Sequence, residues 1–484
     1  MILAIVCQFS RAEIDLDRAL ARLMTCQIEA FVYNPQQDAS QRVLPMSVSS
    51  KHPNATGSKS TLPQMIAEKL TFTLPLDYQD AAKGEINVFA RTLVHKDKQH
   101  LELPWLVYFQ GGPGFAAQRP VSHSGWIKRA LTEYRVLLLD QRGTGLSTPV
   151  NATSLAHLDD AGKADYLSHF RADNIIRDAE AIRAILSPDT PWTILGQSFG
   201  GFCVLRYLSV AAHGLKEAFI TGGIPPLGRS ADEVYRATYK RVLQKNRDFH
   251  QRFTDAAPLL ADLHRYLLEH PVLLPPGQQL TPQMLQLLGI HLGMEDGPES
   301  VYYLLEQALQ FTPSGNRINP LFVERFAQML DYNTNPLFAV LHEAIYCEQQ
   351  ASNWAAHRIR AEYPQFDAAP PAPLLLTGEM IFPWMFDCFE HLKPLKGCAE
   401  LLAAKTDWPP LYDPAALANN TVPVAAAIYS EDMFVEMDFS LETAKQVANL
   451  KYWLTSEYEH NGIRMDGERI FDRLIAINRG ACLR

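Results

Sequence analysis

The feature that most constrains the fold of this chain is an alternation of short apolar runs with helical patterns between residues 85 and 223. Apolar runs that end in glycine or polar residues are typical of buried strands. Such runs occupy 85–94, 103–112, 134–143, 192–197 and 217–223. Apolar residues recur at helical spacing over 172–186, and a second helical pattern follows Ser198. This alternation predicts an α/β fold with a mostly parallel sheet and crossover helices.

The 484 residues are long for a single core, and the pattern changes along the chain. The beginning is polar and irregular, and 47–63 reads as a flexible linker. After the fifth apolar run the chain becomes rich in helical patterns and prolines, until strand and helix patterns return at 422–432 and 467–478. The sequence therefore predicts a loosely ordered extension over 1–67, a sheet domain from 68–224 and 421–484, and an inserted helical cap domain over 225–420.

Composition argues against several functional classes. The formal net charge of -9 is spread along the chain without a basic block, which disfavours nucleic acid or an anionic membrane as a partner. No apolar run approaches the roughly 20 residues of a membrane span, and the N-terminal run is short for a signal peptide. Seven cysteines, an odd number without a CxxC pair, favour free thiols in a reducing compartment. We therefore expect a cytoplasmic protein.

No spacing typical of a metal site is present. The sequence from His342 begins like the HExxH helix of a zinc peptidase, but Tyr346 stands where the second histidine is required. We expect neither a metal ion nor an organic cofactor.

Residues Gly196 to Gly200 read GQSFG and match the pattern G-x-S-x-G, with an apolar strand pattern before it and a helix pattern after it. A serine on such a sharp turn has a strained backbone, and β-carbons beside it would collide with the neighbouring strand and helix. The motif therefore predicts that Ser198 is a nucleophile, whereas an ordinary strand-to-helix turn would need no such pattern.

A serine hydroxyl needs a base, and the base needs an acid to orient it. In sheet enzymes of this type the acid and the histidine follow the serine in chain order. One late strand pattern ends in carboxylates, at Glu431 and Asp432, and His460 follows it in a loop. We select Asp432 over Glu431 because it lies further beyond the strand and its shorter side chain is held more rigidly. The predicted catalytic residues are thus Ser198, Asp432 and His460.

Negative charge that develops on a substrate carbonyl oxygen needs backbone N–H donors. The glycine loop FQGGPGF directly follows a strand pattern upstream of the serine. We assign one donor to Gly112 in this loop and the other to Phe199, the residue after the nucleophile.

Taken together, several stretches resemble the α/β-hydrolase-fold proline iminopeptidases of the larger type, which have a long helical cap. These stretches are GGPGF (111–115), LLLDQRGTGLS (137–147), FRADNIIRDAEAIR (170–183), ILGQSFGGF (194–202), TGEMIFPWMF (377–386) and SEYEHNGIR (456–464). The resemblance extends from about Leu70 to the C-terminus and implies an α/β-hydrolase fold with the same three catalytic residues. It also implies release of an N-terminal residue, preferentially proline, from peptides with a free N-terminus.

In this family, glutamates of the cap bind the substrate amine. The resemblance implies Glu343 and Glu379 for this role, with Glu348 as an alternative, and Trp384 as one of the aromatic residues that wall a proline pocket. A protonated N-terminal proline has two N–H donors, which two carboxylates would satisfy. From the DQRGTGLS stretch, Asp140 and Arg142 are expected to fix loops beneath the site.

Two other functions stay open at this point. The same catalytic residues would suit an esterase or an aminopeptidase of broad specificity, which differ only in what the cap recognises. A catalytically silent member of the same fold would serve as a binding module, although an intact set of catalytic residues disfavours that reading.

Overall fold

The computed structural model describes residues 28–32, 44–48, 58–275, 277–367 and 374–482. The first two ranges form a two-stranded antiparallel sheet of β1 (Ile28–Val32) and β2 (Leu44–Val48). They belong to a unit of their own, and the described residues from 58 onward form a second, compact unit.

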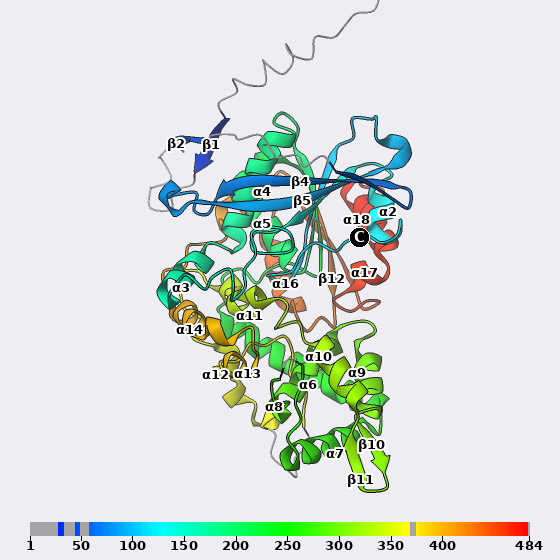
Figure 1. Cartoon of the computed structure of the whole chain (residues 1–484). Coiled ribbons are helices and arrows are strands. Elements are labelled where there is room, and N and C mark those ends of the chain that lie inside the picture. The colour runs from blue at the N-terminus through cyan, green and yellow to red at the C-terminus, as the bar shows by residue number, and fades with distance from the viewer. Residues whose placement is uncertain (1–27, 33–43, 49–57, 276, 368–373, 483–484) are drawn as a thin grey trace, which may run out of the picture. The chain divides into compact units, whose positions relative to one another are not determined.

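A nine-stranded sheet forms the centre of the second unit (Figure 1). Its order is β13-β12-β9-β8-β6-β7-β5-β4-β3, in which the strands from β13 to β7 are parallel and β5, β4 and β3 continue antiparallel. The strands are β3 (Lys59–Leu62), β4 (Met65–Pro75), β5 (Glu85–His95), β6 (Trp105–Phe109), β7 (Arg135–Asp140), β8 (Trp192–Gln197), β9 (Leu215–Thr221), β12 (Val424–Tyr429) and β13 (Leu450–Thr455). The predicted α/β class with a mostly parallel sheet is confirmed.

Helices cover both faces of this sheet because successive strand residues point to opposite sides. Tyr108 of β6 belongs to an apolar cluster with α2 and α18, and the adjacent Val107 belongs to a second cluster with α4 and α5. Figure 1 shows α17 and α18, coloured red, beside α2. The helices of this part are α2 (Gly125–Ala130), α3 (Asp160–Ser168), α4 (Ala172–Leu186), α5 (Phe199–Ala211), α16 (Met437–Gln446), α17 (Gly462–Met465) and α18 (Gly467–Asn478).

Between β9 and β12 the chain forms mostly helices, which gather below the sheet in the view of Figure 1; we call this stretch the helical segment. It begins with a capping box, in which the Ser230 hydroxyl accepts from the N–H of Glu233 and the Glu233 carboxylate accepts from the N–H of Ser230. Its helices are α6 (Ala231–Arg252), α7 (Ala256–Glu269), α8 (Pro282–Gln286), α9 (Gly297–Glu306), α10 (Pro320–Met329), α11 (Pro336–Leu341), α12 (Ala355–Ile359), α13 (Met385–Cys388), α14 (Lys396–Ala404) and α15 (Pro414–Ala418).

Shorter elements complete the fold. The helical segment contains an unexpected antiparallel hairpin of β10 (Leu309–Thr312) and β11 (Gly315–Ile318). The 3₁₀ helices are η1 (Ala81–Lys83), η2 (Lys96–Lys98), η3 (Ala212–Gly214), η4 (Leu287–Gly293), η5 (Glu343–Tyr346), η6 (Arg360–Glu362), η7 (Pro364–Phe366) and η8 (Lys393–Leu395).

The sheet starts earlier in the chain than the sequence suggested. The expected end of the extension at residue 67 falls inside β4, and β3 lies within the stretch 47–63 that reads as a linker. The four residues of β3 are largely exposed and polar, so no apolar alternation marks them. Their strand conformation comes from antiparallel pairing with β4, a contact that the local pattern does not encode.

Asp140 and Arg142, at the end of β7, hold loops together as expected. Asp140 is fully buried, accepts from the N–H groups of Ala117 and Leu146, and forms an ion pair with Arg119. Arg142 is also buried, forms an ion pair with Asp178 of α4 and donates to backbone carbonyl oxygens of two further loops. These contacts fix the loops that follow the central strands.

The structure bears on two expectations from the sequence, the lack of a membrane span and the free cysteines. In the part of the chain that the structure describes, no helix is both long and apolar enough to cross a membrane. Cys203, Cys347, Cys388 and Cys398 form no disulfide. Cys7, Cys26 and the N-terminal apolar run lie outside the described residues.

Candidate active site

Ser198 occupies the turn between β8 and α5, at the carboxyl end of a central strand. Its backbone has φ 54° and ψ −126°, a conformation that residues with side chains rarely adopt. Two neighbouring glycines make the turn possible. A β-carbon at Gly200 would overlap the carbonyl oxygen of Phe109, and one at Gly196 would overlap that of Gly200. The turn therefore holds Ser198 at the edge of the sheet, where it lines a cavity.

Ser198, His460 and Asp432 form a hydrogen-bonded chain. Nε2 of His460 lies 2.9 Å from Oγ of Ser198, and Nδ1 lies 2.7 Å from Oδ2 of Asp432. With Nδ1–H donated to the carboxylate, Nε2 is the atom that accepts the serine proton. The three residues are 8%, 4% and 1% exposed, respectively, so bulk water has little access to their hydrogen bonds. This is the arrangement that serine nucleophiles require.

Asp432 is held in place by the turn after β12. Its Oδ1 accepts from the backbone N–H groups of Phe434 and Val435, at 2.8 and 3.0 Å, which leaves Oδ2 to face the histidine. The alternative acid, Glu431, points elsewhere and forms an ion pair with Arg241 at 2.9 Å. The structure therefore brings Asp432, and not Glu431, to the imidazole.

The loop that carries His460 is fixed from the helical segment. The N–H of His460 donates to the carbonyl oxygen of Gly293, and the side chain of Asn461 accepts from the N–H of Glu295. The ring of Phe434 stacks on the imidazole with ring centres 4.4 Å apart. The imidazole is therefore a buried ring that contacts on several sides restrain.

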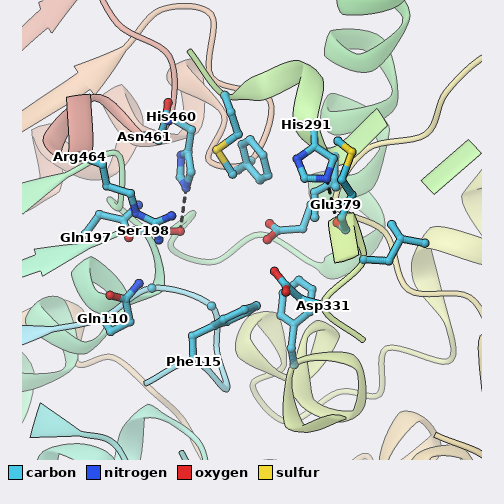
Figure 2. Close-up of a pocket in the computed structure, with 18 of the residues that line it drawn as sticks. Gln110, Phe115, Gln197, Ser198, His291, Asp331, Glu379, His460, Asn461 and Arg464 are labelled. Atoms are coloured by element: carbon cyan, nitrogen blue, oxygen red, sulfur yellow. Dashed lines mark hydrogen bonds between the residues drawn. The ribbon is translucent and has the colours of Figure 1, made fainter. Parts of the chain in front are cut away.

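A cavity of about 130 Å³ opens beside Ser198 (Figure 2). Four of the residues selected from sequence line it: Gly112, Ser198, Glu379 and His460. Its apolar wall is formed by Phe115, Ile290, Met294, Met329, Leu330, Tyr332, Phe338 and Phe434. Most of these residues belong to the helical segment, so the segment supplies the wall that faces the serine. A cavity of this size accommodates a compact side chain.

The two residues expected to donate N–H groups to an oxyanion are Phe199, which follows the nucleophile in the chain, and Gly112, which lines the cavity beside it. Phe199 is the first residue of α5, where a backbone N–H has no acceptor within the helix. Gly112 belongs to the loop after β6, which passes directly against the serine. A β-carbon at Gly111 in this loop would lie 2.8 Å from Cβ of Ser198 and 2.7 Å from the side-chain oxygen of Gln197. Glycine is therefore needed for this close approach.

Glu379 is a largely buried carboxyl group that has no cationic partner among the described residues. Its side chain is 15% exposed and lies 3.8 Å from Nε2 of His342. Burial lowers the pKa of His342 to about 4, so this imidazole is neutral at neutral pH. Burial, with a smaller contribution from the negative charge of Asp432, raises the pKa of Glu379 to about 8. A bound cation would relieve the cost of ionising this carboxyl group.

The cavity is also lined by two charged side chains that the sequence analysis did not single out. Asp331 is exposed and lies in the loop between α10 and α11. Arg464 lies on α17, four residues after His460. Figure 2 shows Glu379 and Asp331 on one side of Ser198 and Arg464 on the other. In the sequence, Asp331 belongs to a polar stretch between two helical patterns. Exposed polar residues of this kind are common on any protein surface, so the stretch does not mark Asp331 as a site residue.

Glu343, Glu348 and Trp384 do not line the cavity. Both carboxylate oxygens of Glu343 accept backbone N–H groups, from Ala355 and Ala356 at 2.9 Å each, at the start of α12. Glu348 likewise accepts from the N–H groups of Leu411 and Tyr412. The ring of Trp384 stacks on Phe382. Of the three candidate glutamates, only Glu379 reaches the site, because the other two satisfy backbone donors.

Comparison with known proteins places these features in a family. Residues 104–461 match the family described as alpha/beta hydrolase fold. The chain is 58% identical over 409 residues to a proline iminopeptidase of Aeromonas sobria, in a match that covers 84% of this chain and 95% of that protein. It is 35% identical to a proline iminopeptidase of Aspergillus aculeatus, over 84% of this chain and 92% of that one. A solved structure of a proline iminopeptidase from Mycobacterium smegmatis matches at 14% identity with a TM-score of 0.41, over 85% of this chain and 100% of that one.

Proposed function

The chain belongs to the alpha/beta hydrolase fold family and, within it, to the proline iminopeptidases, and on this premise we propose that it is a serine aminopeptidase that releases an N-terminal residue, preferentially proline, from peptides. The observation that carries the proposal is the position of a buried carboxyl group without a cation, Glu379, in the same cavity as the Ser198–His460 pair. A hydrolase that acts on neutral esters has no use for such a group.

The reaction is acyl transfer through a covalent intermediate. His460 takes the proton of Ser198 as the serine oxygen attacks the carbonyl carbon of the N-terminal residue. Asp432 orients the imidazole and stabilises its charged form. The same imidazole then protonates the departing amine, and water that it activates releases the acyl group from the serine. The 2.9 and 2.7 Å distances along this chain support these roles.

The negative charge on the tetrahedral intermediate is stabilised by the backbone N–H groups of Gly112 and Phe199. Phe199 follows Ser198 along the chain, and Gly112 lines the same cavity as Ser198. No metal ion or organic cofactor has a part in this proposal.

Recognition of the substrate amine falls to Glu379, with Asp331 as the second carboxylate in place of Glu343. The ammonium group of an N-terminal proline carries two N–H donors and one positive charge. When it binds, it supplies the cation that Glu379 lacks, and the carboxylate ionises. A peptide bond or an acetylated proline supplies no charge, so the same carboxyl group stays protonated or becomes an uncompensated buried charge. The cavity thus favours free N-termini over internal peptide bonds.

A panel of substrates tests the proposal. Proline 4-nitroanilide should be cleaved with the highest kcat/KM, alanine 4-nitroanilide more slowly, and N-acetylproline 4-nitroanilide at the background rate. If the acetylated compound and simple nitrophenyl esters are cleaved as well as proline 4-nitroanilide, the protein is an esterase and the proposal fails. Equal rates for proline and alanine would instead indicate a broad aminopeptidase. The cytoplasmic location expected from the cysteine pattern stays part of the proposal, and cell fractionation tests it.

A further inference from the structure

Arg464 is a cation at the cavity that has no ion-pair partner among the described residues. It lies on α17, its side chain is exposed, and it lines the same cavity as Ser198. Three other arginines are paired: Arg119 with Asp140, Arg241 with Glu431, and Arg469 with Glu457. The charge of Arg464 is therefore available to a ligand.

A neutral group holds this side chain at the cavity. When the amide of Gln110 is oriented so that its oxygen meets donors, that oxygen accepts from the N–H of Gly111 at 3.1 Å and from Nη2 of Arg464 at 3.3 Å. An amide positions a guanidinium without cancelling its charge, and the remaining N–H groups can bind a carboxylate in the paired geometry that guanidinium groups favour. Gln110 thus holds Arg464 at the cavity without neutralising its charge.

The charges are distributed on opposite sides of the nucleophile. Glu379 and Asp331 lie on one side of Ser198 in Figure 2, and Arg464 lies on the other side. A peptide bound with its ammonium group at the carboxylates has its leaving group on the side of Arg464. This orientation rests on the function proposed above.

The position of Arg464 limits the length of the leaving group that it can recognise. One residue of extended chain spans at most about 3.6 Å, so the carboxylate of a dipeptide lies within one residue of the bond to be cleaved. In a tripeptide the carboxylate lies a further residue away from the serine. Arg464 and Gly111 donate to the same Gln110 oxygen, and Gly111 packs against Ser198, so this cation suits a leaving group that is a single amino acid.

We propose that Arg464 binds the terminal carboxylate of the leaving amino acid, so that dipeptides with N-terminal proline are the preferred substrates. A charge-assisted hydrogen bond to a carboxylate contributes enough to give roughly a tenfold preference or more in kcat/KM. Longer peptides and amides are cleaved, but without this contribution.

The experiment compares Pro-Ala, Pro-Ala amide and Pro-Ala-Ala, which differ in the presence and position of the carboxylate. The wild-type protein should cleave Pro-Ala with a kcat/KM about tenfold above that of either other peptide. In Arg464→Gln, kcat/KM for Pro-Ala should fall by about tenfold more than kcat/KM for the amide, and Arg464→Lys should retain part of the preference. Arg265→Gln, which removes an exposed arginine of α7 outside the cavity, is the matched control and should keep the wild-type preference.

Equal kcat/KM for Pro-Ala and its amide in the wild-type protein would overturn the inference without any variant being made. A folded Arg464→Gln protein that loses the same factor on both peptides would also overturn it. Neither result affects the proposed function, which depends on cleavage of proline 4-nitroanilide and is tested separately, since that compound carries no carboxylate.

Discussion

Nε2 of His460 lies 2.9 Å from Oγ of Ser198, although 262 positions separate the two residues in the chain. The whole helical segment lies between them in sequence. The two residues meet because β8 and β13, the strands that precede them, belong to the same parallel part of the sheet, with β9 and β12 between them, and the loops after these strands open at the same edge. The catalytic contact is therefore a product of sheet topology, which brings distant loops together.

Replacement of the nucleophile should abolish most of the activity without unfolding the protein. We expect Ser198→Ala to lower kcat for proline 4-nitroanilide by roughly 1,000-fold or more, because the covalent route is lost. Ser209→Ala is a matched control: Ser209 is also 8% exposed, but its hydroxyl donates to the carbonyl oxygen of Leu205 within α5. Activity of Ser198→Ala within about tenfold of wild type would show that another group is the nucleophile.

Glu379 and Glu343 should respond differently to the same change. Glu379→Gln should raise KM and lower kcat/KM for proline 4-nitroanilide by about 10- to 100-fold, because the ammonium loses a charged acceptor. Glu343→Gln should mainly lower the melting temperature. Each carboxylate oxygen of Glu343 accepts one backbone N–H group at the start of α12, and in glutamine an NH₂ group, which cannot accept, replaces one of these oxygens. Steady-state kinetics and thermal unfolding of both variants test this; equal changes in KM would contradict the assignment.

The stability of the protein should depend on the ionisation of Glu379. The pKa of this group is raised from 4.5 to about 8 by burial and by the charge of Asp432. Between these two values the folded protein keeps a proton that the unfolded chain loses, so the free energy of unfolding falls as pH rises. The glutamine in Glu379→Gln cannot ionise, so the free energy of unfolding of this variant does not fall with pH for this reason.

The measurement is thermal unfolding of wild type and Glu379→Gln at about pH 5 and about pH 9. The variant should gain stability relative to wild type at the higher pH, by on the order of 1 kcal/mol or more. A difference between the two proteins that does not change with pH would mean that Glu379 ionises freely in the folded state.

The buried ion pair between Arg142 and Asp178 should be needed for folding stability. The two side chains are 0% and 1% exposed and lie 2.6 Å apart. Asp178→Asn would leave a buried guanidinium without its counter-charge, which costs about 3 to 5 kcal/mol. Urea unfolding measures this loss. Asp262→Asn, which breaks an exposed pair with Arg265, should unfold at the wild-type urea concentration.

Several elements could be predicted from sequence because local signals and tertiary contacts agree. The helix expected over 172–186 is α4, and the helix expected over 467–478 is α18, with the same bounds. In α4, apolar residues at helical spacing face the sheet, so the pattern that marks the helix is also the surface that it buries. Buried strands such as β8 were recognisable for the same reason.

Elements that lack a buried face were missed. β3 is largely exposed and polar, and β13 at the other edge of the sheet is half-exposed and has only the short apolar run 452–454. Their conformation depends on pairing with β4 and β12. An edge strand gains its order from a neighbour, which local sequence does not specify.

The site shows the same division. Ser198 was found because the backbone turn imposes glycines around it, and chain order then pointed to Asp432 and His460. Glu343 was misjudged because a carboxylate that caps backbone N–H groups and one that faces a cavity look alike in sequence. Asp331 and Arg464 acquire their significance only from the cavity that they line.

The helical segment enters and leaves the sheet between β9 and β12, and it brings Glu379 and Asp331, whereas Ser198, Asp432 and His460 come from the flanking stretches. On the proposed function, bond-breaking and selection of the amine are thus encoded in separate portions of the gene. A lineage can remodel the inserted portion and acquire new preferences at the N-terminal residue while the reacting groups keep their positions.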